Sequence, residues 1–379
     1  MRTVIIRPHR YQQFGRAERD TNFYLITDSP ESFTIEQDGS YHSCQILVYS
    51  DDKNFLELIE QTQEPAHVLV ICPNHFISSI EPQQISQRKL AIMAANSAPT
   101  SIKAIEHFAK VVENTDPLAQ KEFADRFFSL IEQSDFLQIT DEEYKVSATF
   151  SHFDDEHYEW FEQGGYLDWG CQQLAPSGEL SVLPLAHGQF DFQRKLAING
   201  EIALRGFPIL HSGKPSFLAA DQARIYGQLS VLKEHAVLAK VENGMITQLD
   251  ATHPSVEAAK AMLEMMFAVD SRYAQIWELG FGINTALDIW DDNTAMNEVY
   301  GGENGVLHFG IGLTPFTQYH LDIICPSTKV LTNKGELLIG SSHNTRSSNS
   351  SKKIVRHTVS ICPCDTQSIP NLAQPLNPT

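Results

Sequence analysis

The stretch VLHFGIGLTPFTQYHLDIIC, residues 306–325, contains two apolar runs that each carry a histidine. The runs Gly305–Ile311 and Tyr319–Ile324 have the composition of buried strands. Residues two apart on a strand point to the same face, so His320 and Asp322 would place an imidazole beside a carboxylate. A buried aspartate needs a cation or hydrogen-bond donors to offset its loss of water. The pair therefore predicts half of a metal site, or a hydrogen-bonded pair that caps a strand.

Three more ionisable side chains occur in apolar or glycine-rich surroundings. His308 lies within the first apolar run, Glu278 precedes the segment Leu279-Gly280-Phe281-Gly282, and Glu179 follows Pro-Ser-Gly. For Glu179 alone, an exposed turn residue is the simpler interpretation. Taken together, two histidines and three carboxylates supply ligands that suit a pair of divalent ions such as zinc, manganese or cobalt, or one non-haem iron.

The surrounding second half of the chain is rich in predicted strands. Further strands are expected at Leu180–Leu185, 200–204 and Ala236–Val241, and one helix at Val256–Phe267. Asn243-Gly244 predicts a two-residue hairpin turn, because both positions favour positive φ. This pattern indicates an α+β unit over residues 151–379. It is expected to end in a flexible loop at Ser341–Ser351, a last strand at Ile354–Cys362 and a frayed tail.

The first 150 residues alternate short apolar runs with amphipathic segments, which favours an α/β layer with a mostly parallel sheet. The expected strands are Val4–Ile6, Tyr24–Ile26, Ile46–Tyr49, Val68–Ile71 and Leu90–Met93. The expected helices are Asn54–Gln61, Ser101–Glu113 and Leu118–Gln133. No glycine-rich phosphate loop follows any of these strands, so nothing supports a nucleotide site. The predicted organisation is an α/β domain at 1–150 followed by the strand-rich domain.

Composition narrows the possible partners. The chain of 379 residues carries 28 Lys plus Arg against 47 Asp plus Glu, a net charge of −19, which argues against nucleic acid. No apolar run approaches the roughly 20 residues that span a bilayer, and the N-terminus lacks an apolar signal core. We therefore expect a cytoplasmic protein without membrane association. The close cysteine pair Cys362-Pro-Cys364 has no second pair at zinc-finger spacing.

The order of these motifs resembles that of the aminopeptidase T and aminopeptidase S family of dinuclear metallopeptidases. The resemblance covers roughly residues 165–340, and its parts appear in one sequential order. They are Pro-Ser-Gly-Glu179, Glu278-Leu-Gly-Phe-Gly-Ile-Asn, Asn297-Glu298, Val-Leu-His308-Phe-Gly and His320-Leu-Asp322. The hairpin at 241–246 and the helix at 256–267 also fall where that family has them.

The resemblance implies the metallopeptidase fold and a set of site residues. The implied metal ligands are Glu179, Glu278, His308, His320 and Asp322, with Glu278 or a neighbouring carboxylate moving the proton. It further implies two divalent ions (zinc, cobalt or manganese), hydrolysis of an N-terminal peptide bond by a metal-activated water, a peptide as substrate and a homodimer. The residues that would bind the substrate stay unknown.

Two departures from the family pattern keep other functions open. His308 and His320 are only 12 positions apart, and Tyr319 is the one tyrosine between them, too close to His320 to match the catalytic tyrosine of the family. Residues 211–226 are expected to form an inserted loop. One alternative is a catalytically silent protein that binds a peptide, for instance the precursor peptide of a modified natural product. The other is an iron dioxygenase on the same fold.

Overall fold

We describe the protein from a computed structural model. The described residues are 3–50, 54–77, 80–153, 158–186, 189–190, 193–212, 219–314, 316–340 and 354–358. Within them, no helix is both long and apolar enough to cross a membrane. The predicted loop at 341–351, the tail and the pair Cys362 and Cys364 lie outside the described residues, as do residues 359–362 of the predicted last strand.

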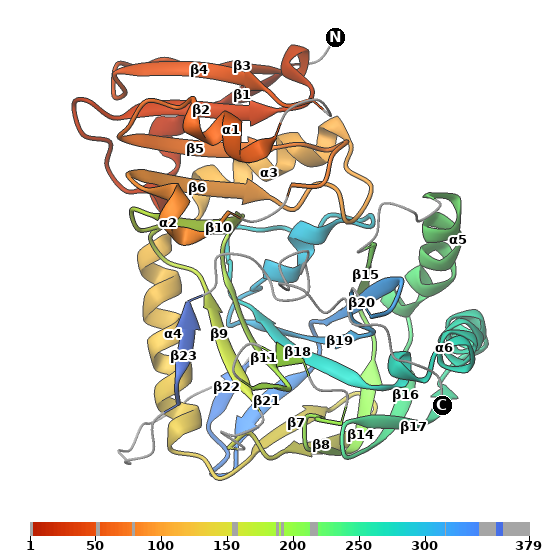
Figure 1. Ribbon diagram of the computed structural model, residues 1–379. Helices are drawn as coiled ribbons and strands as arrows, with labels where there is room; N and C mark the ends of the chain where they lie inside the picture. Colours follow the sequence, from red (N-terminus) through yellow and green to blue (C-terminus); the bar gives the residue numbers. More distant parts are fainter. Residues whose placement is uncertain are drawn as a thin grey trace, which may run out of the picture.

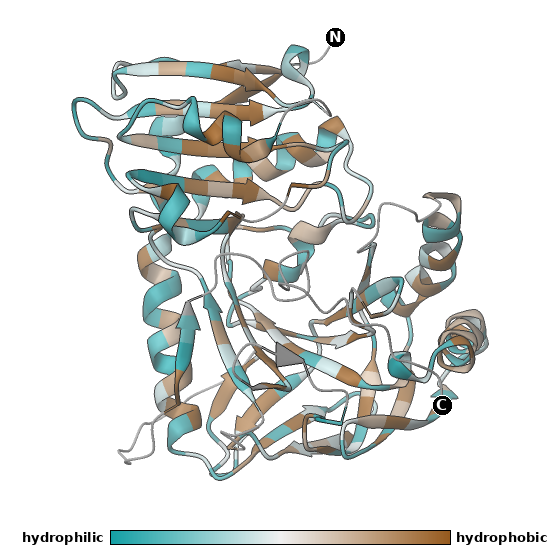
Figure 2. Cartoon of the chain, in the orientation of Figure 1, coloured by the Kyte–Doolittle hydropathy of each residue, from teal (hydrophilic) through white to brown (hydrophobic). Residues whose placement is uncertain are grey.

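A five-stranded parallel sheet forms the upper part of the molecule (Figure 1). Its strands in spatial order are β10 (Cys171–Ala175), β6 (Arg88–Met93), β5 (Ala66–Ile71), β2 (Asn22–Thr27) and β4 (Ser43–Val48). Every residue of β2 and β5 is buried, as expected for the centre of a parallel sheet. Figure 2 shows these strands as largely hydrophobic. A short parallel pair, β1 (Val4–Ile6) and β3 (Phe33–Ile35), packs into the core beside this sheet.

Two seven-stranded sheets form the rest of the molecule. We call the first the site sheet; in spatial order it contains β15 (Phe207–Ser212), β20 (Tyr319–Cys325), β19 (Val306–Ile311), β18 (Ile276–Gly282), β11 (Glu179–Leu183), β9 (Glu159–Gln163) and β23 (Arg356–Thr358). The second sheet contains β17 (Met245–Ala251), β16 (Val237–Glu242), β14 (Ile198–Leu204), β8 (Val146–Phe150), β7 (Leu137–Asp141), β21 (Lys329–Thr332) and β22 (Leu337–Ile339). All pairings in the two sheets are antiparallel except that of β23 with β9. A two-stranded ribbon, β12 (Leu185–Ala186) and β13 (Gln189–Phe190), follows β11.

Helices cover both faces of the first sheet and flank the two lower sheets (Figure 1). They are α1 (Phe55–Glu60), α2 (Pro82–Ile85), α3 (Ile102–Asn114), α4 (Pro117–Glu132), α5 (Ala219–Leu229) and α6 (Glu257–Val269). α4 begins at Pro117 because the Asp116 carboxylate accepts hydrogen bonds from the amides of Leu118 and Ala119. α4 runs along one side of the lower part, and α5 and α6 lie on the opposite side.

Most predicted elements appear at their predicted places. All five strands expected before residue 150 are present, and α1, α3 and α4 match the expected helices within a few residues. The hairpin turn at Asn243-Gly244 has φ values of 48° and 73°. The mixed α/β class is thus confirmed. β7 and β8 precede residue 150 but lie in the sheet of β14, and β10 returns to the first sheet; the domain division at residue 150 stays a prediction.

The expectation of an inserted loop at 211–226 is wrong. Residues 211 and 212 end strand β15, and residues 219–226 belong to α5. The apolar run Phe207–Leu210 that precedes His211 is a strand that pairs with β20. This pairing joins segments more than a hundred residues apart in the sequence, so the local pattern gave no indication of it.

Candidate metal centre

The two faces of the site sheet have opposite character. On β18, β19 and β20, Leu279, Leu307 and Leu321 lie in the hydrophobic core shared with the second sheet. The alternate residues point the other way, because side chains along a strand alternate between faces. The ionisable residues of this opposite face, all buried, are Glu179, His211, Glu278, His308, His320 and Asp322. Strand alternation therefore collects histidines and carboxylates on one face of one sheet.

These side chains and Glu298 form three adjoining groups, which together we call the His–carboxylate cluster. Within each group, one nitrogen or oxygen from every residue lies within 4.8 Å of the others. The groups are Glu179 with Glu278 and His308, Glu278 with His320 and Asp322, and Asp322 with His211 and Glu298. Because Glu278 and Asp322 each belong to two groups, the three groups form one continuous row.

Two glycines leave the space that the cluster needs. Gly280 pairs with His308 across the strands, and a Cβ on Gly280 would lie 1.9 Å from Nε2 of that histidine. Gly310 lies between Glu278 and Asp322 in the strand register, and its Cβ would lie 3.0 Å from Oδ1 of Asp322. Only glycine fits at positions where side chains of neighbouring strands cover the backbone this closely.

A buried polar network holds the turn that presents Glu179. The side-chain amides of Gln120 and Asn284 donate to the carbonyl oxygen of Ser177 at 2.8 and 2.7 Å. Gly178 has φ of 123°, and a Cβ there would lie 2.8 Å from Cβ of Asn284. The turn therefore has one tightly packed conformation that directs Glu179 into the cluster, and the exposed turn position considered from sequence does not apply.

Hydrogen bonds orient two of the histidine rings. Nδ1 of His320 donates to the carbonyl oxygen of Gly312 at 2.7 Å, which leaves Nε2 facing Asp322 Oδ1 at 3.1 Å. Nδ1 of His211 lies 3.0 Å from Oγ of Ser97, and its Nε2 lies 3.3 Å from Oδ2 of Asp322. A partner on one ring nitrogen fixes which nitrogen is presented to a metal or a carboxylate.

The charges of the cluster balance one another in pairs. Burial raises the pKa of the Glu179 carboxyl to about 8, although His308, 3.3 Å away, acts in the opposite direction. Burial alone would lower the pKa of His211, but the charge of Glu298 at 2.6 Å and the contact with Asp322 outweigh it and raise the pKa to about 10. With protein groups alone, His211 is thus held as an imidazolium beside Glu298 and Asp322, whereas burial holds the Glu179 carboxyl largely in its neutral form near pH 7.

The fit of a cation can be judged from atoms that lack a hydrogen bond. Both carboxylate oxygens of Asp322 are buried, and their contacts with Nε2 of His320 and of His211, at 3.1 and 3.3 Å, lack good hydrogen-bond geometry. Buried polar atoms are normally satisfied, so each such atom calls for an explanation. Imidazole nitrogens and carboxylate oxygens are also the ligands that zinc, manganese and cobalt take in proteins. The chemistry of the cluster fits a divalent ion.

All five ligand positions named from sequence lie in this cluster, and their role as ligands stays a proposal. Sequence reasoning missed His211, which it assigned to a loop, and it named Glu298 without giving it a ligand role. The apolar run before His211 resembles the one around His308, and this similarity was the available indication. Glu298 comes from a short 3-10 helix, Ala295–Val299, which has no strand periodicity to mark it.

These features define a mixed α/β protein with a buried row of histidines and carboxylates on one face of a largely antiparallel sheet. The sequence matches the family described as crocagin biosynthetic protein CgnE/B over residues 45–333, so the chain belongs to that family. This is not an aminopeptidase family, and the resemblance to aminopeptidase T stays a hypothesis. No curated protein sequence matches the chain.

The solved structures that resemble this one include two enzymes. The 2,5-dihydroxypyridine dioxygenase of Pseudomonas putida aligns with a TM-score of 0.52 and 13% identity, over 88% of this chain and 94% of the dioxygenase. Wild-type AmpT from Thermus thermophilus aligns with a TM-score of 0.41 and 11% identity, over 87% of this chain and 94% of AmpT. At these identities the first similarity supports the general α/β fold alone, and the second is too weak to carry an argument.

Proposed function

We propose that the protein is a metal-dependent hydrolase of the aminopeptidase type that works in the biosynthesis of a crocagin-type product. Membership of the CgnE/B family supports the biosynthetic role. The observation that carries the chemistry is the convergence of three histidines and four carboxylates in one buried row, where both oxygens of Asp322 face imidazole nitrogens without a well-aligned hydrogen bond. The thermophilic-metallopeptidase type of fold is part of this proposal.

In this proposal the metal ligands are the five residues Glu179, Glu278, His308, His320 and Asp322. A divalent ion bound there would lower the pKa of a water molecule and polarise a peptide carbonyl. Glu278 belongs to two of the three groups and lies 3.4 Å from Nε2 of His320. Its carboxylate would accept the proton of the attacking water and pass it to the leaving amine. His211 and Glu298 extend the row and could hold a further cation or the amine of the substrate.

A second candidate is a peptide-binding protein without catalysis, and the position of Tyr319 favours it. Strand alternation places Tyr319 in the hydrophobic core, on the face opposite to His320. Its hydroxyl accepts a hydrogen bond from the Gln318 amide at 3.3 Å. Tyr319, the one tyrosine between His308 and His320, therefore points away from the cluster and supplies no hydroxyl there. The peptide partner and the homodimer stay predictions for both candidates.

Metal content separates the candidates. The protein would be purified without a metal-binding tag, and bound metals would be measured by plasma mass spectrometry beside His320→Ala and Glu179→Ala. His253→Ala is a matched control, because His253 is exposed, its ring hydrogen-bonds only Ser255, and its other contact is a stack on His235, outside the cluster. We expect bound zinc, manganese or cobalt that is lost in both cluster variants and kept in the control, together with trimming of N-terminal residues from a peptide set.

Each other outcome contradicts the hydrolase in a defined way. Stoichiometric iron with oxygen-dependent turnover would indicate the dioxygenase alternative. Absence of metal after reconstitution with zinc, manganese, cobalt and iron would overturn both enzyme candidates. Bound metal without cleavage of any peptide would favour the peptide-binding candidate.

A further inference from the structure

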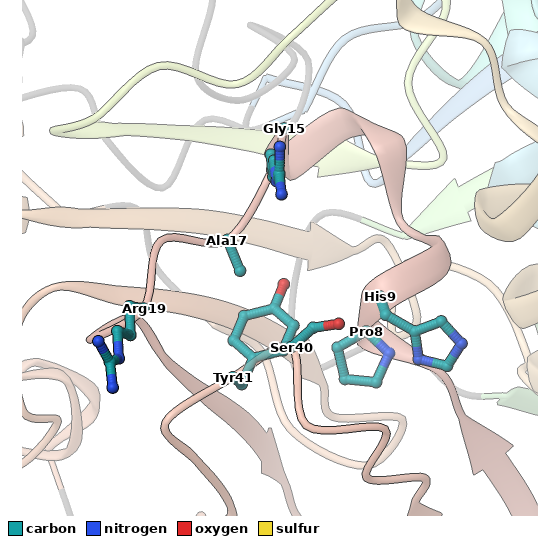
Figure 3. A pocket seen from close by; sticks show the side chains of 8 residues that line it. Pro8, His9, Gly15, Ala17, Arg19, Ser40 and Tyr41 are labelled. Carbon is teal, nitrogen blue, oxygen red and sulfur yellow. The ribbon is translucent and has the colours of Figure 1, made fainter.

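A second feature lies far from the cluster in the sequence, on the first sheet. It is a pocket of about 340 Å³, which we call the arginine pocket (Figure 3). Its lining residues are Pro8, His9, Gly15, Arg16, Ala17, Arg19, Ser40 and Tyr41. None of them is acidic, but Asp38 and Glu36 adjoin the pocket: Asp38 accepts hydrogen bonds from Ser40, and both carboxylates lie within 4 Å of His9. The positive charge of the pocket therefore rests on its two arginines, Arg16 and Arg19.

The arginines of this region differ in their pairing. Arg7 donates to Glu113 at 3.0 Å, and Arg10 lies 3.4 Å from the same carboxylate. Arg16 and Arg19 are exposed and form no ion pair with any residue that the structure describes. Two cations without carboxylate partners in one concave site leave their donors available to a ligand with negative charge.

The other lining residues would let a bound carboxylate side chain pack against the ring of Tyr41. Figure 3 shows Tyr41 between Arg19 on one side and Ser40, Pro8 and His9 on the other. The Tyr41 hydroxyl lies 2.9 Å from Nδ1 of His67, so the ring is held in place. Tyr41 and Pro8 supply apolar surface, and the arginine guanidinium groups match the planar geometry of a carboxylate.

The strand that follows the pocket adds a site for an extended chain. Two residues after Tyr41, β4 begins at Ser43. β4 is the last strand in the sheet order and is paired with β2 alone among the described residues. Figure 1 places it at the outer border of this sheet. Its residues are half-buried or exposed, unlike those of β2. An edge strand of this kind offers the backbone groups of residues 43–47 to a bound peptide.

We infer that the arginine pocket binds a carboxylate side chain of an acidic peptide that pairs with the edge of β4. The arginines select the carboxylate, and the strand edge selects an extended peptide over a free small anion. This site is separate from the His–carboxylate cluster and does not depend on metal.

The test measures binding of short fluorescein-labelled peptides by anisotropy. The peptides form pairs that are identical except for glutamate or glutamine at one position. We expect the glutamate peptides to bind at least roughly tenfold more tightly than their glutamine partners. This preference should disappear in the double variant Arg16→Gln, Arg19→Gln. It should persist in Arg10→Gln, which removes the positive charge of an arginine that does not line the pocket. Backbone amides of Ser43–Leu47 should exchange hydrogen more slowly with peptide bound.

Several results would overturn the inference. They are equal binding of glutamate and glutamine peptides, an unchanged preference in the double variant, and no binding of any acidic peptide. Competition by acetate or phosphate without a preference among peptides would identify a simple anion site instead. Unchanged exchange in β4 would overturn the strand pairing. Measuring the same peptides with Glu179→Ala separates this inference from the proposed enzyme, because that variant should lose metal and keep peptide binding.

Discussion

The ring of His308 lies directly over the backbone of Gly280: a Cβ added at Gly280 would stand 1.9 Å from Nε2 of the histidine. The two residues pair across β18 and β19, and both are buried. The position of His308 in the cluster therefore depends on the absence of a side chain on the neighbouring strand.

Gly280→Ala should displace His308 and weaken metal binding at least roughly tenfold, with a loss of about 1–3 kcal/mol in the free energy of unfolding from overpacking. Metal titration and chemical denaturation measure the two effects. Gly227→Ala is the control, because a Cβ there meets nothing within 4 Å and alanine favours its helix α5. Wild-type metal binding in Gly280→Ala would contradict the role of His308 as a ligand.

Asp322→Asn should abolish stabilisation of the protein by metal. Asp322 belongs to two of the three groups, and asparagine keeps its size while it removes the charge. A ligand that binds only the folded protein stabilises it by about 2.7 kcal/mol at a concentration of 100 Kd, so zinc or manganese should raise the Tm of the wild type. Asp221→Asn changes a carboxylate of α5 that is about half exposed and pairs with Arg224, outside the cluster, and should respond as the wild type does. An equal rise of Tm in Asp322→Asn would argue against the proposed site.

We expect the free energy of unfolding to decrease in mild acid, below pH 6.5, because of His67. Burial lowers the pKa of His67 from 6.5 to about 3, and its ring stacks on Phe14 at 4.8 Å. Below pH 6.5 the unfolded chain binds a proton that the folded protein does not. This contribution to stability is therefore complete above pH 6.5 and is lost by about 1.4 kcal/mol per unit as the pH falls toward 3.

His67→Asn removes the titrating group and keeps a polar atom near the Tyr41 hydroxyl. The difference in unfolding free energy between wild type and His67→Asn should shrink as the pH falls from 6.5, because only the wild type carries the histidine penalty. Denaturation curves at several pH values measure this difference. A difference that is constant with pH would show that His67 does not titrate as expected.

Gly244→Ala should destabilise the hairpin of β16 and β17 by about 1–3 kcal/mol. Gly244 has φ of 73°, and a Cβ there would lie 2.4 Å from the carbonyl oxygen of Leu196. Gly335→Ala serves as the comparison: its φ is 81°, but a Cβ there meets nothing within 4 Å. We expect Gly335→Ala to show the backbone cost alone, about 1 kcal/mol, and Gly244→Ala to exceed it in thermal or chemical denaturation. Equal losses would mean that the contact with Leu196 relaxes freely.

Local sequence patterns predicted much of the fold. Apolar runs located the strands of the first sheet, and Asn243-Gly244 located a hairpin, because both features depend on residues close together in the chain. The same reasoning failed at His211, where a strand was taken for a loop. Its partner strand β20 follows more than a hundred residues later, and no local periodicity marks such a pairing.

The sequence by itself determined which residues share a face along each strand, as with His320 and Asp322, because alternation is a property of the single chain. Tertiary structure alone decided which strands lie next to one another and in what register. That register places Gly310 between Glu278 and Asp322 and His211 opposite His320. The cluster therefore exists only in the folded sheet, since its groups come from segments between residues 179 and 322 that non-local hydrogen bonds bring together.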